Sequence, residues 1–66
     1  MNIGIIGLGL IGGSFALTAR KFIKGSILYG EDHNKLHQNQ ALELKIVDQT
    51  LKPSKYHKMD VIILAI

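Results

Sequence analysis

A short glycine-rich segment near the start of the chain holds the residues whose spacing could do chemistry. Gly7, Gly9 and Gly12 form the pattern G-x-G-x-x-G. In such a turn the first glycine permits a tight bend, the second lets a pyrophosphate approach the backbone, and the third lets a helix pack closely on a strand. The N–H groups that open the helix, around Leu10 and Ile11, would then face the phosphates. The pattern therefore predicts a phosphate-binding turn.

An acidic residue, Asp32, follows about twenty positions after Gly12, the spacing at which dinucleotide-binding domains place the acid that binds the adenosine ribose. A carboxylate there accepts hydrogen bonds from both ribose hydroxyls and repels a 2′-phosphate, so it favours NAD over NADP. Glu31 is adjacent and takes this role if the end of the preceding strand shifts by one residue. No Gly-Lys-Ser/Thr closes the turn, which excludes a P-loop.

The elements that must position these residues alternate between strand and helix. Short β-branched runs predict buried strands, apolar residues at helical spacing from Leu10 to Phe22 predict a helix that Gly25 ends, and Asn34 is typical of a helix N-cap. Pro53 opens a polar turn or a single helical turn. The expected order is strand 3–6, helix 10–24, strand 26–30, helix 35–45, strand 46–47, a turn, and strand 61–66. This alternation predicts an α/β fold with a parallel sheet and right-handed crossovers.

Composition excludes several classes of protein and of site. The 66 residues include no cysteine, which excludes disulfides and thiolate zinc sites. The net charge of +3 comes from scattered Lys and Arg, which indicates a solvated surface and no nucleic-acid partner. Residues 3–19 are uncharged but too few to span a membrane, and no secretory signal is present, so we expect a cytoplasmic protein. The three histidines are a poor ligand set, so we expect no metal, and we expect His37 and His57 to be surface residues.

The apolar segment DVIILAI closes the chain. A doubly wound dinucleotide-binding domain contains more strands and helices than 66 residues provide. We therefore expect residues 1–66 to be the N-terminal portion of such a domain, a partial Rossmann fold truncated after its fourth strand, with the rest of the domain and a helical catalytic domain absent. We expect this piece alone to be inactive, and its uncovered apolar surface to promote self-association.

Four segments of the chain resemble the start of the prephenate dehydrogenase family, which includes the arogenate and cyclohexadienyl dehydrogenases of tyrosine biosynthesis. These segments are GLGLIGGS at 7–14, YGEDHN at 29–34, ALELKIVD at 41–48 and DVIILAI at 60–66. The resemblance covers essentially the whole chain, but only the cofactor half of such an enzyme. The chain departs from the family pattern at residues 43–45, where the family usually has Leu-Gly, and at Glu31, where an apolar or aromatic residue is common.

By position, the resemblance implies which residues bind NAD. The pyrophosphate would lie on the glycine turn, the ribose on Asp32, and the end of the last strand beside the cofactor. The implied cofactor-binding residues are Gly7, Gly9, Leu10, Ile11, Gly12, Asp32, Leu64 and Ala65. His33, next to the acid, is a candidate for contact with the adenine. No catalytic residue is expected within 1–66, because none of the three histidines matches the position of the family's catalytic histidine.

The resemblance implies an NAD-dependent oxidoreductase that converts prephenate to 4-hydroxyphenylpyruvate with loss of carbon dioxide, and we expect it to be a homodimer. Two alternatives stay open at this point. One is another NAD(P)-dependent dehydrogenase, of the arogenate or β-hydroxyacid type, although the absence of arginine after Arg20 disfavours NADP. The other is a regulatory module that binds NAD without chemistry. A proline and a helical domain with His and Arg after Ile66 would indicate the enzyme.

Overall fold

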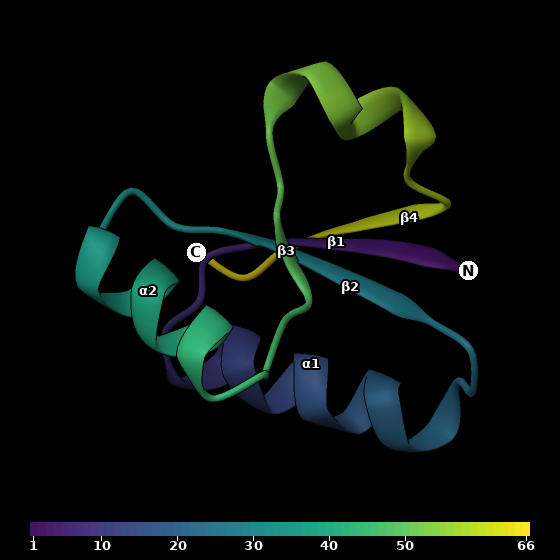
Figure 1. Ribbon diagram of the computed structural model, residues 1–66, viewed down its shortest axis with the longest axis horizontal. Helices are drawn as coiled ribbons and strands as arrows, with labels where there is room; N and C mark the ends of the chain where they lie inside the picture. The colour runs from purple at the N-terminus through teal and green to yellow at the C-terminus, as the bar shows by residue number, and fades with distance from the viewer.

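The computed structural model describes all residues from Met1 to Ile66 as one sheet flanked by helices (Figure 1). The elements follow the predicted alternation. They are β1 (Asn2–Ile6), α1 (Leu10–Phe22), β2 (Ile27–Glu31), α2 (Lys35–Glu43), β3 (Gln49–Thr50), the 3-10 helix η1 (Pro53–Lys58) and β4 (Val61–Leu64). The four strands are parallel and form one sheet in the order β3-β2-β1-β4. The predicted α/β class, with a parallel sheet, is therefore confirmed.

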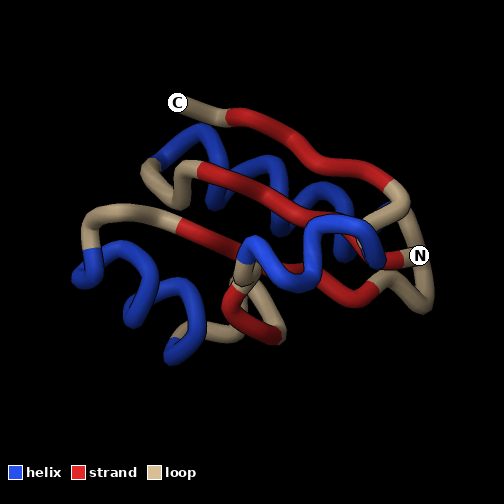
Figure 2. Tube along the Cα trace, turned by 90° about the horizontal axis from the view of Figure 1, so that it is seen from above, coloured by secondary structure: helices blue, strands red, loops and turns tan.

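The two faces of the sheet are covered by different parts of the chain. Helices α1 and α2 lie on one side of the sheet, and η1 lies on the other (Figure 1). The strand order runs from β1 through β2 to β3 and then returns to the free edge of β1 for β4, as Figure 2 shows. The point where the order reverses, at the carboxyl ends of the strands, is where open α/β sheets bind ligands.

The buried core lies between the sheet and the two helices. Ile3 and Ile5 of β1 and Leu28 of β2 are almost inaccessible, and they cluster with Ala16 and Ala19 of α1. The helix thus presents small side chains to the sheet, which lets it lie close to the strands. The large apolar residues whose spacing predicts this helix are exposed instead: Leu10, Ile11, Phe15, Leu17 and Phe22. Neither helix has the length and apolar character that a membrane crossing requires.

Asn34 caps the start of α2, as the sequence predicts. Its side-chain oxygen accepts hydrogen bonds from the backbone N–H groups of Leu36 at 2.9 Å and His37 at 3.3 Å. These bonds satisfy donors at the helix start that otherwise lack partners. The cap fixes the first turn of α2 immediately after Asp32, so the end of β2 and the start of α2 form one corner of the molecule.

The strand predicted at residues 46–47 is wrong, because the third strand forms at Gln49–Thr50. Lys45 adopts a left-handed φ of 59°. The N–H groups of Lys45 and Ile46 donate back to carbonyls in the last turn of α2, which is the Schellman ending of a helix. Ile46 therefore belongs to the end of α2, and Val47 is buried in the core. The helix C-cap overrides the β-preference of these two side chains, and pairing with β2 begins after them.

Asp48 joins three elements on the helical side of the sheet. One oxygen of its carboxylate accepts the backbone N–H of Leu28 at 2.8 Å, and the other contacts the guanidinium group of Arg20 at 3.1 Å. The backbone N–H of Asp48 donates to the carbonyl of Leu28 at 2.7 Å. Arg20 also donates to the carbonyl of Ile46 at 3.3 Å. This junction ties α1 to β2 and to the segment that precedes β3.

Candidate functional site

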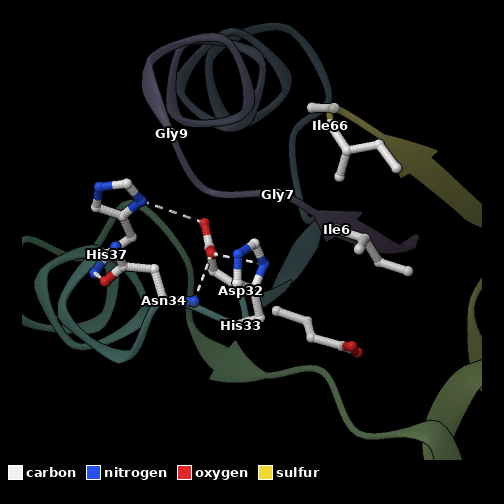
Figure 3. Close-up of a pocket in the computed structure, with 10 residues that line it drawn as sticks. Ile6, Gly7, Gly9, Asp32, His33, Asn34, His37 and Ile66 are labelled. Carbon is white, nitrogen blue, oxygen red and sulfur yellow. Dashed lines mark hydrogen bonds and ion pairs between the residues drawn. The ribbon is translucent and has the colours of Figure 1, made fainter.

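A cavity of about 440 Å³ opens where the carboxyl ends of β1, β2 and β4 meet. Its walls come from the glycine turn after β1, the residues around the end of β2, the first turn of α2 and the residues after β4 (Figure 3). The lining residues are Ile6, Gly7, Gly9, Glu31, Asp32, His33, Asn34, His37, Ala65 and Ile66. The cavity therefore lies at the reversal of strand order, and it contains both the turn and the acid that the sequence singles out.

The three glycines of the turn meet different requirements. Gly7 has a φ of +100°, and a Cβ on it would lie 2.5 Å from the carbonyl oxygen of Ala65. A Cβ on Gly12 would collide with the carbonyl oxygen of Gly7. A Cβ on Gly9, in contrast, would meet no atom within 4 Å. The fold itself requires Gly7 and Gly12, whereas Gly9 leaves open space beside the cavity into which a ligand can approach the backbone.

Helix α1 begins at this turn without a side-chain cap. Gly9 is the N-cap residue, no side chain accepts from the first N–H groups, and no acidic residue lies in the first turn. The side chain of Leu10 is 90% exposed and that of Ile11 is also exposed, so the backbone at this end is not covered. An uncapped helix start with free N–H groups and the positive end of the helix dipole is suited to an anion such as a phosphate.

Asp32 is the first residue after β2, and its side chain is only 7% exposed. Its Oδ2 accepts the backbone N–H of Leu8 at 2.7 Å, and its Oδ1 accepts the N–H of Asn34 at 2.8 Å. The bond from Asn34 has the largest effect on the pKa of Asp32 and lowers it below the ordinary value of 3.8. Burial opposes this lowering, and the contacts with Leu8 and His37 reinforce it. The carboxylate is therefore ionised at neutral pH and joined to the glycine turn.

Glu31, the other acid considered for the ribose, is engaged elsewhere. Strand β2 extends through Glu31, one residue beyond its predicted end. The Glu31 carboxylate accepts the hydroxyl of Tyr56, from η1, at 2.7 Å. This hydrogen bond, together with partial burial, raises the pKa of Tyr56 above its ordinary value of 10.0. Glu31 thus anchors η1 to the end of β2, and Asp32 is the acid held against the glycine turn.

His37 is exposed, as expected of a surface residue, and it also lines the cavity. Its Nδ1 lies 3.4 Å from Oδ2 of Asp32, and its side chain is 44% exposed (Figure 3). His33 differs, because its ring is 99% exposed and its Nδ1 is 3.7 Å from Oδ1. His57 lies on η1 and is exposed. The sequence signal that could have indicated His37 is its place in the first turn of a helix that begins shortly after Asp32 in the chain.

The structure brings together only part of the predicted set of site residues. Gly7, Gly9, Asp32 and Ala65 line the cavity. Leu10, Ile11 and Gly12 lie just beyond it in the first turn of α1, and Leu64 is exposed at the end of β4. Leu10 lines a second hollow of about 370 Å³ between α1 and α2, which also includes His37. The end of the chain at Ile66 also lines the cavity, as expected of the last strand, and the lining residues that the sequence did not indicate as ligand-binding are Ile6, Asn34 and His37.

Comparison with known proteins gives matches among solved structures. No protein-family model matches the chain, and no curated protein sequence matches it. Among solved structures, the chain is similar to prephenate dehydrogenase from A. aeolicus in complex with hydroxyphenyl propionate and NAD+, with a TM-score of 0.81 and 33% sequence identity. The match covers 97% of this chain and 23% of that enzyme, so the chain spans about a quarter of its length. In fold and in sequence, the chain is similar to the prephenate dehydrogenase family, as its own residues indicate.

Proposed function

We propose that this chain forms the NAD-binding part of a prephenate dehydrogenase. The observation that carries the proposal is a hydrogen bond between the glycine turn and the acid. The backbone N–H of Leu8, which lies in the glycine turn, donates to the carboxylate of Asp32 at 2.7 Å. One connected unit at the carboxyl edge of the sheet thus offers donors for a pyrophosphate and acceptors for a ribose. The similarity to a prephenate dehydrogenase that was solved with NAD+ supports the same assignment.

The residues present fit this cofactor. Gly9 leaves open space where a diphosphate must approach the backbone. The uncapped N–H groups at Leu10 and Ile11 can donate to the phosphates, so the site needs no lysine. Gly7 and Gly12 keep the turn and the helix close enough to present these groups. Asp32 would accept the adenosine ribose hydroxyls, and its charge would repel a 2′-phosphate, so NAD is favoured over NADP. Leu64 and Ala65 would flank the cofactor at the end of β4.

The proposed overall reaction oxidises prephenate, with loss of carbon dioxide, to 4-hydroxyphenylpyruvate, a step in tyrosine biosynthesis. NAD+, when bound, supplies the hydride acceptor. The residues of this chain bind and orient it, and none of them is proposed as catalytic. The proposal places the groups that bind prephenate outside residues 1–66, in the remainder of the dinucleotide-binding domain and a helical catalytic domain. It also includes a homodimer and a cytoplasmic location.

Turnover by the full-length protein tests this function. Prephenate is supplied with NAD+ or NADP+, reduced cofactor is followed by absorbance, and 4-hydroxyphenylpyruvate is identified as the product. We expect turnover with NAD+, and we expect Asp32→Asn to lower the preference for NAD+ over NADP+, because the substitution removes the charge that repels a 2′-phosphate. Saturable NAD+ binding without turnover of prephenate or arogenate would contradict the reaction and leave a different dehydrogenase or a regulatory module.

A further inference from the structure

The side chain of His37 stands between the two hollows on this edge of the molecule. It lines the cavity that contains Asp32, and it also lines the second hollow between α1 and α2. From the first turn of α2 its Nδ1 reaches within 3.4 Å of Oδ2 of Asp32 (Figure 3). The proposed function assigns no role to this ring, although it occupies the space directly beside the acid that would bind the ribose.

The contacts of Asp32 show how the ring of His37 limits the hydrogen bonds that this carboxylate can accept from a ligand. A carboxylate has about four lone-pair sites, two on each oxygen. On Oδ2, the N–H of Leu8 takes one site, and Nδ1 of His37 lies 3.4 Å away, beside the other site. On Oδ1, the N–H of Asn34 takes one site, and the only other neighbour is His33 at 3.7 Å, too far for a hydrogen bond. A ribose diol needs one site on each oxygen, so His37 holds a site that the ribose needs.

The two contacts with Oδ2 differ in strength. The bond from Leu8 is short and comes from the backbone, so it is fixed by the fold. The contact with His37 is long, and the ring is nearly half exposed, so it can rotate away when another donor arrives. The cavity holds three other ionisable side chains, Glu31, Asp32 and His33. The second hollow that the ring lines holds none. The contact with Asp32 is therefore the electrostatic interaction that holds the ring of His37 in this position.

We infer that His37 competes with the adenosine ribose for Asp32 and so sets the affinity for NAD. The inference rests on the proposed function, because it requires that Asp32 bind a ribose. In the free protein the ring of His37 contacts the buried carboxylate of Asp32, and the ring is displaced when the cofactor binds.

Calorimetric titration of the full-length protein with NAD+ tests this inference. We expect His37→Ala to tighten NAD+ binding by about threefold to tenfold, the equivalent of one exchanged polar contact. His37→Asn places another donor near the same position, so it keeps the affinity of the parent protein. His57→Ala is the control, because His57 lies on η1 and lines neither cavity, and we expect it to change the affinity less than twofold.

The outcomes separate this inference from the proposed function. Unchanged or weaker NAD+ binding by His37→Ala would overturn the competition, because weaker binding is what the removal of a ring that positions Asp32 or contacts the ribose would cause. A gain of the same size with His57→Ala or with His37→Asn would also overturn it. Absence of NAD+ binding in the parent protein and in every variant would overturn the proposed function, and this inference with it.

Discussion

Two carboxylates, Asp32 and Asp48, have similar local contacts but different surroundings. Each accepts a short backbone hydrogen bond from another segment of the chain, at 2.7 Å from Leu8 and 2.8 Å from Leu28. The second oxygen of Asp48 pairs with Arg20, a permanent cation, and Asp48 lines neither cavity. Asp32 has only imidazole rings for ionisable partners, and it lines the larger cavity.

This difference distinguishes the acid that we propose binds the ribose from one that serves the fold. A carboxylate that joins an arginine to the backbone and lines no cavity stabilises the fold, so its removal affects stability. A carboxylate that is held by backbone N–H groups but lacks a permanent cation keeps acceptor capacity for a ligand. We expect substitutions at the two positions to separate into an effect on binding at Asp32 and an effect on stability at Asp48.

The largest expected effect is on cofactor affinity at Asp32. We expect Asp32→Ala to weaken NAD+ binding by about a hundredfold, because two hydrogen bonds to a charged acceptor are lost. Titration calorimetry measures the change, and Asp48→Ala serves as the matched carboxylate removal. If both variants bind NAD+ equally well once the folded fraction is taken into account, the distinction between the two acids is wrong.

The effect next in size is on stability at Asp48. We expect Asp48→Ala to lower the free energy of unfolding by about 2 kcal/mol, mainly because the buried N–H of Leu28 loses its partner. The contact with Arg20 is partly exposed, so the ion pair adds little. Denaturant unfolding measures the loss. Asp60→Ala is the control, since Asp60 is exposed and accepts the N–H of Asn2 at 2.7 Å, and a loss as large there would contradict the assignment.

The lowered pKa of Asp32 predicts how stability depends on pH. The folded-state pKa lies below the unfolded value, near 3.8, so the contribution of Asp32 is fully present above about pH 4. It is lost as pH falls from there through the folded-state pKa. Unfolding free energies of the parent protein and of Asp32→Asn, measured from pH 7 down to pH 3, should therefore converge at the acidic end. A constant difference between them over the whole range would contradict this prediction.

The smallest expected effect is on stability at Lys45, which is not among the hydrogen-bond partners of Asp32 or Asp48. Its left-handed backbone at φ 59° disfavours a side chain with a Cβ. We expect Lys45→Gly to stabilise the protein by about 0.5 kcal/mol, because relief of this strain exceeds the greater flexibility of glycine in the unfolded chain. Lys45→Ala keeps the strain and removes the charge, so it should give no gain. Thermal unfolding of the two variants distinguishes backbone strain from charge.

Local patterns in the sequence predict most of the fold and the centre of the site. The glycine spacing, the cap at Asn34 and the β-branched runs are each decided by neighbouring residues, and the structure contains the elements that they predict. The strand at residues 46–47 failed because the residue at Lys45 ends α2 in a conformation usually taken by glycine. A lysine at that position gives no sign of the turn, and the two β-branched residues after it then resemble a strand.

Features that depend on distant contacts could not be predicted in this way. The role of Asp48 requires knowing that Arg20 and Leu28 lie on either side of it, and their separation in the sequence gives no indication of this. The close packing of Gly12 was predicted, but the place of Ala16 and Ala19 on the buried face of α1 was missed, because they carry less apolar surface than the exposed residues around them. His37 was missed because a histidine on a polar helix is ordinarily a surface residue.

The hydrogen bond from Leu8 to Asp32 has a consequence for the energetics of mutation. Because the glycine turn and the acid are one bonded unit, a change that displaces the turn also releases the carboxylate, and loss of the carboxylate also loosens the turn. Free energies of binding for substitutions at the two places should therefore not add, and the double variant should lose less than the sum of the single losses. The two halves of the dinucleotide would then be recognised by a single cooperative element.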